Sequence, residues 1–209
     1  MACGDDDGRD SPAAADSRDG ATAAGDPFAP VSPSPATGAS ATLAPTPACG
    51  DDDDADDPTP PQTAGPFFTP NSPERTSLLE PGMPGTKLVL AGRVLSTACQ
   101  PLSGALIDFW QTDDAGEYDN AGFRLRGHQF TDSTGRYRLE TILPGLYTGR
   151  TRHIHVKVQA ANRPLLTTQL YFEGEPGNGR DGIFSPDLAM ALRDAGGAKE
   201  ATFDFVLRV

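Results

Sequence analysis

His153 and His155 lie two residues apart in a stretch whose β-branched residues and alternating character predict a strand. Side chains two residues apart in a strand point to the same face, so we expect the two imidazoles side by side, with Ile154 facing the other way. The chain has three histidines in all, and Tyr147 and Arg150 stand just before this pair. The pattern indicates a metal site, although such a pair can also be a surface feature that binds nothing.

A metal bound by two neutral imidazoles needs anionic ligands, and residues 147–158 contain no Asp or Glu. Tyr118 and Tyr147 fall in turn-rich segments beside strand ends, where loops often supply functional groups. Tyr137 and Tyr171 fall inside alternating strands and are predicted to be core or sheet-face residues. A bound cation favours a deprotonated tyrosine, and two phenolates with two imidazoles suit Fe(III) better than Zn(II) or Fe(II). Taken singly, either turn tyrosine could equally be a packed turn residue.

Short strands are the elements that must position these residues. Alternating or β-branched segments predict strands over residues 87–95, 105–111, 128–131, 136–142, 152–159, 165–172 and 201–209. One helix is predicted from Ser185, a good N-cap, with Pro186 at its first position and Gly196 at its end. The pattern predicts an all-β fold of the sandwich or barrel type: a β-sandwich core, one short helix towards the C-terminus and an irregular N-terminal arm over 70–84.

Charge divides the 209-residue chain, whose formal net charge is −12, into two parts. Residues 1–60 hold thirteen Asp and two Arg, whereas residues 61–209 hold fifteen Lys and Arg against sixteen Asp and Glu. The first part is rich in Asp, Ala and Pro, and we predict a disordered tail that is dispensable for activity. The second part is predicted to be one domain. It is nearly neutral and shows no basic stripe, so we expect no nucleic-acid partner.

The three cysteines are too far apart to form a metal cluster. Cys3, with Ala2 before it and acidic residues after it, resembles the mature end of a bacterial lipoprotein. We therefore expect an extracytoplasmic, lipid-anchored or secreted protein, with a cytoplasmic one as the alternative. If the protein is exported, we expect Cys49 and Cys99 to form a disulfide, because Cys49 lies just before the arm and Cys99 lies in a turn.

The folded part contains a series of recognisable stretches: QTAGPFF (62–68), GALIDFW (104–110), GEY (116–118), RGHQ (126–129), TD (131–132) with Gly135, TILPGLY (141–147), RTRHIH (150–155) and TQLYFEG (168–174). Through these stretches, in the same order, it resembles the intradiol ring-cleavage dioxygenases, which include catechol, hydroxyquinol and protocatechuate dioxygenases and their compact extracytoplasmic relatives. The resemblance as a whole covers nearly all of residues 63–209.

This resemblance implies a non-haem Fe(III) enzyme that uses O2 to cleave catechol-type rings between the two hydroxylated carbons. Its iron-binding tyrosines fall on Tyr118 and Tyr147, and its histidines on His153 and His155. The resemblance also implies that Tyr147 leaves the iron when a catechol binds. Two further catalytic residues, an arginine and a glutamine, fall on Arg150 and Gln169. The loop between Tyr147 and His153 is short, as in the compact relatives.

Two other classes of function stay open at this point. One is a non-catalytic β-sandwich lipoprotein that binds or displays a ligand. The other is a zinc hydrolase that uses the two histidines. A zinc hydrolase needs a general base beside the metal, and residues 147–158 offer no carboxylate.

Overall fold

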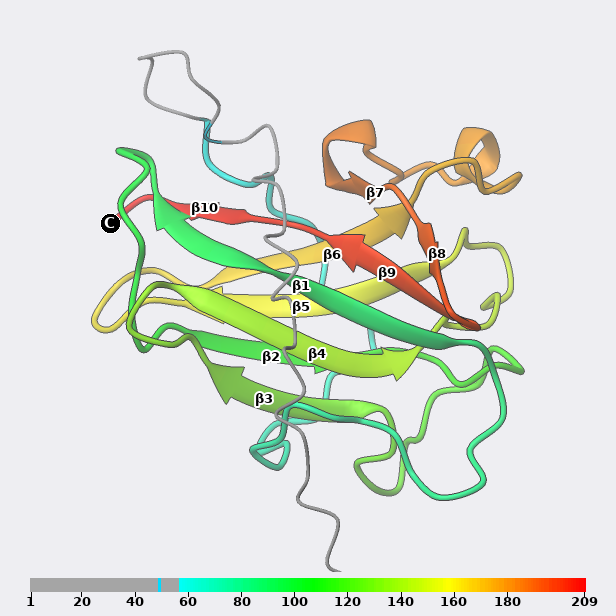
Figure 1. The fold of residues 1–209 in the computed structure, drawn as a ribbon. Helices are drawn as coiled ribbons and strands as arrows, with labels where there is room; N and C mark the ends of the chain where they lie inside the picture. The colour runs from blue at the N-terminus through cyan, green and yellow to red at the C-terminus, as the bar shows by residue number, and fades with distance from the viewer. Residues whose placement is uncertain (1–48, 50–56) are drawn as a thin grey trace, which may run out of the picture. The chain divides into compact units, whose positions relative to one another are not determined.

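The computed structural model describes Cys49 and residues 57–209, which form two five-stranded sheets that lie face to face (Figure 1). In chain order the elements are β1 (Lys87–Ser96), β2 (Leu106–Trp110), β3 (Arg126–Phe130), β4 (Arg136–Ile142), β5 (His153–Gln159), β6 (Leu166–Phe172), the 3-10 turns η2 (Asn178–Arg180) and η3 (Pro186–Leu188), then β7 (Ala189–Met190), β8 (Arg193–Ala195), β9 (Ala198–Thr202) and β10 (Phe205–Leu207). The predicted all-β sandwich is confirmed.

Strand β5 is the centre of the sheet that carries the histidines. That sheet has the order β3-β2-β5-β6-β7, and β5 runs antiparallel to both β2 and β6. Ile154, Val156 and Val158 of β5 are fully buried in the hydrophobic core. Because side chains alternate along a strand, His153 and His155 point to the other face. The predicted pairing of the histidines on one face is confirmed.

The N-terminal arm, which in the structure also includes residues 59–69 ahead of the predicted 70–84, covers the histidine face of this sheet. The side chain of Gln169 in β6, which is paired with His155, donates to the carbonyl of Thr63 in the arm, at 2.8 Å. Further along the arm, the ring of Phe68 packs against that of Trp110, with 4.9 Å between ring centroids. A face that would otherwise meet solvent is therefore enclosed between strands and arm, which is how two histidines outside the core become buried.

The other sheet is built on β1, which has β4 on one side and β9 and β10 on the other. Both β9 and β10 run parallel to β1 in one continuous register, where a single strand over 201–209 was predicted. The ladder is interrupted at Asp204, whose carboxylate accepts the Arg93 N–H at 2.7 Å. Because a side-chain oxygen takes the place of the backbone carbonyl as acceptor at this point, the predicted strand is divided into two.

The predicted helix from Ser185 to Gly196 is wrong. The helical structure in this range is limited to the single 3-10 turn η3, and Ser185 makes no side-chain capping hydrogen bond. The chain then extends as β7, which pairs with β6, and as β8. Gly196 and Gly197 both have positive φ, and together they form the two-residue turn between β8 and β9. A glycine pair at this position is typical of a β-hairpin, so Gly196 makes a turn and does not end a helix.

Cys49 and Cys99 form a disulfide, with their Cα atoms 5.8 Å apart, as predicted. Thr59 is buried and exchanges hydrogen bonds with Val206 of β10, so the chain contacts the domain from Thr59 onward. Of the tail predicted over residues 1–60, residues 1–48 and 50–56 lie outside the described residues, and so does the predicted lipid anchor at Cys3. Within the described part, no helix has the length and apolar character to span a membrane.

Candidate metal centre

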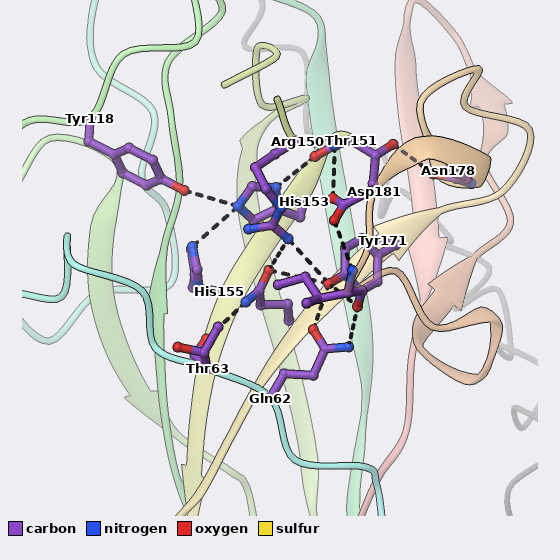
Figure 2. A network of polar contacts seen from close by, with 12 residues as sticks. Gln62, Thr63, Tyr118, Arg150, Thr151, His153, His155, Tyr171, Asn178 and Asp181 are labelled. Atoms are coloured by element: carbon purple, nitrogen blue, oxygen red, sulfur yellow. Dashed lines mark hydrogen bonds and ion pairs between the residues drawn. The ribbon is translucent and has the colours of Figure 1, made fainter. Parts of the chain in front are cut away.

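Three of the four predicted metal ligands converge at the end of β5 (Figure 2). The Tyr118 hydroxyl lies 3.2 Å from Nε2 of His153. That same nitrogen lies 3.2 Å from Nε2 of His155. All three side chains are buried, with 9%, 4% and 3% of Tyr118, His153 and His155 exposed. Three potential donor atoms therefore face one another in a place from which water is largely excluded.

Sheet register explains the placement of the histidines. His153 lies opposite Tyr171 of β6, and His155 lies between Trp110 of β2 and Gln169 of β6. Each histidine therefore has sheet neighbours that restrict its ring. Trp110 stacks on His155 with 4.9 Å between centroids and an interplanar angle of 4°.

Two aspartates build the loop that carries Tyr118. The Asp113 carboxylate accepts the backbone N–H groups of Ala115 and Glu117, and the Asp119 carboxylate accepts those of Ala121, Gly122 and Arg124. Phe67 of the arm stacks on the Tyr118 ring at 4.4 Å. A cavity of about 360 Å³ borders Tyr118 and is not lined by either histidine. Its other lining residues are Gln111, Asp113, Glu117, Asp119, Arg124 and Leu125.

Both histidines are neutral at physiological pH. Burial lowers the pKa of His153 to about 4, although the hydrogen bond to Thr151 acts in the opposite direction. Burial also lowers the pKa of His155 well below its usual value, with the neighbouring His153 adding to the effect. The Nδ1 of His153 lies 2.7 Å from the Thr151 carbonyl and must carry the proton, because a carbonyl only accepts. The lone pair of His153 is therefore on Nε2, which faces the cluster.

Burial raises the pKa of the Tyr118 hydroxyl, and the positive charges of Arg150 and Arg126 offset this only in part. Without a cation the hydroxyl therefore stays protonated and can donate to His153. A bound metal ion reverses this balance, because its charge favours the phenolate.

Tyr147, the fourth predicted ligand, stands apart from this cluster. Its ring meets the Tyr118 ring edge-on at 5.8 Å, and 37% of the residue is exposed. Within residues 57–209, no hydrogen bond joins its hydroxyl to Tyr118, His153 or His155. Tyr147 is thus beside the cluster and open to solvent, while the other three are enclosed.

The donor set fits a metal ion. Ligand atoms held at about 2 Å from one ion lie about 3 Å from each other. The distances from His153 Nε2 to the Tyr118 hydroxyl and to His155 Nε2 are both 3.2 Å, which matches this spacing. The described residues contain no group of three or more His, Cys, Asp and Glu side chains that could hold a metal. The oxygen group that lies beside the histidine pair is the Tyr118 hydroxyl. Two neutral imidazoles together with phenolates would make a hard, anionic site of the kind that suits Fe(III).

Arg150 and Gln169 lie next to this cluster and contact each other. Arg150 Nη2 donates to the Gln169 side-chain oxygen at 2.7 Å, and Gln169 Nε2 donates to the Thr63 carbonyl of the arm at 2.8 Å. Gln169 therefore links the arginine to Thr63 of the arm.

Sequence reasoning missed three members of this network: Asp181, Tyr171 and Gln62. Asp181 pairs with Arg150, 2.8 Å from its Nε. The Tyr171 ring is buried in the core as predicted, but its hydroxyl lies 2.5 Å from Gln62 Oε1 and 3.4 Å from Arg150 Nη2. Burial raises the pKa of Tyr171 to about 12, so this hydroxyl is a neutral donor. Asp181 follows a Gly-rich loop without periodicity, and nothing in the sequence signals its partner.

The fold and the site define an all-β protein with a buried histidine–tyrosine cluster beside a paired arginine. The sequence profile of a family described as dioxygenase matches residues 63–209, which is most of the chain. Chlorocatechol 1,2-dioxygenase of Pseudomonas sp. strain P51 is 30% identical over 175 residues, which cover 70% of this chain and 69% of that protein. The protocatechuate 3,4-dioxygenase beta chain of Burkholderia cepacia is 32% identical over 155 residues, 59% of this chain and 65% of that one.

A solved structure agrees with these relatives. It is the dioxygenase domain of a dioxygenase–carbohydrate-binding protein fusion from Streptomyces sp. SirexAA-E. That domain is 59% identical, superposes with a TM-score of 0.72, and covers 73% of this chain and 99% of its own. The chain belongs to the intradiol ring-cleavage dioxygenases, and is therefore an oxidoreductase.

Proposed function

We propose that this dioxygenase is a non-haem Fe(III) enzyme that cleaves a catechol-type ring between its two hydroxylated carbons with O2. The observation that carries the proposal is the convergence of a tyrosine hydroxyl and the Nε2 of His155 on the Nε2 of His153, each 3.2 Å from it. Relatives named as dioxygenases of chlorocatechol and protocatechuate support the substrate class.

The proposed ligands are Tyr118, Tyr147, His153 and His155. Bound there, Fe(III) would supply a Lewis acid that makes the ring of a catechol reactive towards O2. The histidines supply neutral donors because burial keeps their pKa values low. Tyr147 is the least enclosed of the four side chains, so it would be the ligand that an entering catechol replaces most readily. Its hydroxyl oxygen, once free, would be available as a base for one catechol proton.

Arg150 supplies a fixed positive charge beside the histidines. Its guanidinium is held by Asp181 on one edge and by Gln169 on another. A charge held in place before the reaction stabilises negative charge that develops on the ring, because no reorganisation is needed. Gln169 contributes by fixing the direction of this group, and its other end is anchored on Thr63.

The alternatives receive less support. A zinc hydrolase needs a carboxylate or equivalent base beside the metal. The carboxylate nearest the site in the described network, Asp181, is instead paired with Arg150. The neutral histidine pair beside a fixed arginine suits a metal and a developing negative charge, which an enzyme needs and a non-catalytic binding lipoprotein does not. Family membership also favours the enzyme over both alternatives.

We also propose that the protein works outside the cytoplasm, where the Cys49–Cys99 disulfide can persist. Lipid attachment at Cys3 would anchor it there. Growth with a labelled fatty acid tests the anchor, and a Cys3→Ser variant should lose the label.

Iron content and visible absorbance test the proposed function first. Two phenolates on Fe(III) absorb visible light, so the pure iron-loaded protein should be red to brown. Anaerobic titration with catechol, chlorocatechol, hydroxyquinol and protocatechuate should change this band for the true substrate. Admitting O2 should then consume one equivalent and give the ring-opened dicarboxylate, which is cis,cis-muconate from catechol.

Variants sharpen this experiment. His153→Ala and His155→Ala should lose iron, whereas Arg150→Ala should keep iron and colour but lose most turnover. A yellow semialdehyde product would mean cleavage beside the hydroxyls instead of between them. A colourless protein that prefers zinc and consumes no oxygen with any of the four catechols would overturn the proposal.

A further inference from the structure

We infer that Asp181 is a positioning residue, which uses one carboxylate to fix both the Arg150 guanidinium and the peptide that orients His153. This inference rests on the proposed function, because it gives Arg150 and His153 the roles described above.

Asp181 forms hydrogen bonds with two adjacent residues that lie just before β5. One oxygen, Oδ2, accepts from Arg150 Nε at 2.8 Å and from the Thr151 backbone N–H at 3.0 Å. The other oxygen, Oδ1, accepts the Ile183 N–H at 3.1 Å. The Asp181 side chain is 3% exposed, so these three bonds compete little with water. Three donors around one buried carboxylate leave it a single orientation.

The Thr151 peptide carries this constraint to the histidine. Its N–H is held by Asp181, and its carbonyl accepts from His153 Nδ1 at 2.7 Å. The Asp181 carboxylate and the His153 imidazole are therefore connected through the backbone of a single residue, Thr151. The Thr151 hydroxyl adds a third attachment by donating to Asn178 Oδ1 at 2.7 Å. Because His153 Nδ1 keeps its proton on this carbonyl, its Nε2 keeps the lone pair towards Tyr118 and His155.

The same carboxylate oxygen that accepts the Thr151 N–H also fixes the guanidinium of Arg150. Arg150 has Asp181 on Nε and Gln169 on Nη2, and its side chain is 21% exposed. Burial alone would raise the pKa of Asp181, but the hydrogen bonds from Thr151, Arg150 and Ile183 hold that pKa below its usual value. Asp181 is therefore ionised at neutral pH. An ionised partner orients a guanidinium more strongly than a neutral one does.

A neighbouring ion pair provides a matched control. Glu175 accepts from Arg152 Nε at 2.9 Å and so joins the same two segments of chain. Arg152 also donates to the Pro144 carbonyl, and no described hydrogen bond takes it to His153 or Gln169. Loss of this pair removes a similar tether without touching the arginine or the histidine of the site.

The experiment compares Asp181→Asn, Asp181→Ala and Glu175→Gln in the iron-loaded enzyme with catechol, or with whichever catechol the wild type turns over. Asparagine retains an oxygen for Thr151 but not the charge that orients Arg150. It should therefore keep iron and the visible band, and lower kcat at least about tenfold with a smaller change in KM. Alanine removes both attachments, so it should also release iron to a chelator faster than asparagine does. Glu175→Gln should match the wild type in iron release and kcat.

A double-mutant cycle decides whether Asp181 acts through Arg150. In the Arg150→Ala background, Asp181→Asn should change kcat less than about twofold, because the group it positions is gone. If the fold-loss of kcat in the double variant equals the product of the two single fold-losses, Asp181 does not act through Arg150 and the inference is overturned. A Glu175→Gln variant that loses as much kcat as Asp181→Asn would also overturn it.

Failure of the proposed function would look different. The wild-type protein itself would then bind no iron and turn over no catechol. The metal-free melting temperatures of the same four proteins of the cycle would still show coupling between Arg150 and Asp181, because the contact exists without metal. Absence of that coupling would overturn the inference even in an active enzyme.

Discussion

His153 and His155 are the same residue type in the same strand, yet different forces hold their rings. His153 is fixed by a hydrogen bond to the Thr151 carbonyl. In the described part of the chain, Nδ1 of His155 is buried without a hydrogen-bond partner, and its ring is held by the stack on Trp110 and by the close backbone of Gly65. The His153 ring is thus oriented by a hydrogen bond, and the His155 ring by packing.

Tyr118 is the enclosed one of the two proposed tyrosine ligands, and Tyr118→Phe tests that role. We expect the variant to hold iron less well and to weaken or lose the visible band, because one phenolate is gone. Tyr137→Phe is the control, since its equally buried hydroxyl bonds the Phe203 carbonyl and lies in the core. The control should lose about 1 kcal/mol of stability but keep iron and colour. Equal iron and equal absorbance in both variants would contradict the assignment of Tyr118.

The depressed pKa of His153 makes the metal-free protein sensitive to acid. The unfolded chain takes up a proton near pH 6.5, whereas folded His153 does so only near pH 4. The free energy of unfolding should therefore be unaffected by this residue above pH 6.5 and fall as pH drops from 6.5 to 4, by at most about 3 kcal/mol. Urea unfolding at several pH values measures this. His153→Gln should flatten the slope, and an unchanged slope would refute the prediction.

At the scale of elements, the arm matters as much as the strands. Its backbone at Gly65 adopts φ +65, and a side chain there would lie 3.3 Å from Cε1 of His155. Together with Thr63 and Phe67, which contact Gln169 and Tyr118, it covers the site from one side. A segment that is irregular in structure therefore sets the position of three functional side chains.

Gly65→Ala and Gly104→Ala separate the backbone effect from the contact with His155. Gly104 has nearly the same φ, +67, but nothing lies within 4 Å of an added side chain. Both variants should lose roughly 1–2 kcal/mol of stability, because a left-handed backbone disfavours alanine. Only Gly65→Ala should also weaken iron binding, which is measured as faster release of iron to a chelator. Equal iron release from the two variants would show that the arm does not position His155.

Local sequence patterns predicted some elements better than others, for physical reasons. The strand Arg136–Ile142 was predicted with the correct bounds, because its alternation and flanking turn are both local. The helix from Ser185 failed because its capping residues fit two structures, and pairing of Met190 with Phe172 of β6 decided between them. The site shows the same limit. The same-face histidines follow from period two, but the Arg150–Asp181 pair joins residues 31 apart and depends on tertiary packing.

At the scale of the whole molecule, the packed part reaches beyond the boundary predicted at residue 61. Thr59 bonds Val206 of the last strand, and Cys49 is bonded to Cys99 in the turn after β1. The chain just before the arm is therefore tied to the first and last strands of the sheet opposite the histidines. Because Gln62 and Thr63 then contact the site, these ties also anchor the cover of the histidine face.

Two truncations test where the functional protein begins. Removal of residues 1–48 should leave the melting temperature and turnover unchanged, because this stretch is rich in Asp, Ala and Pro and poor in large apolar residues. Removal of residues 1–60 also removes the disulfide and the Thr59 contacts. Closing a loop of about 50 residues with a disulfide contributes roughly 3–4 kcal/mol of stability. The shorter protein should therefore melt at a lower temperature, and it should lose turnover because the arm is no longer anchored. The control is Cys49→Ser in the full chain, which should reproduce most of the loss of stability. Equal melting temperatures for the two truncations would show that the domain is complete from residue 61.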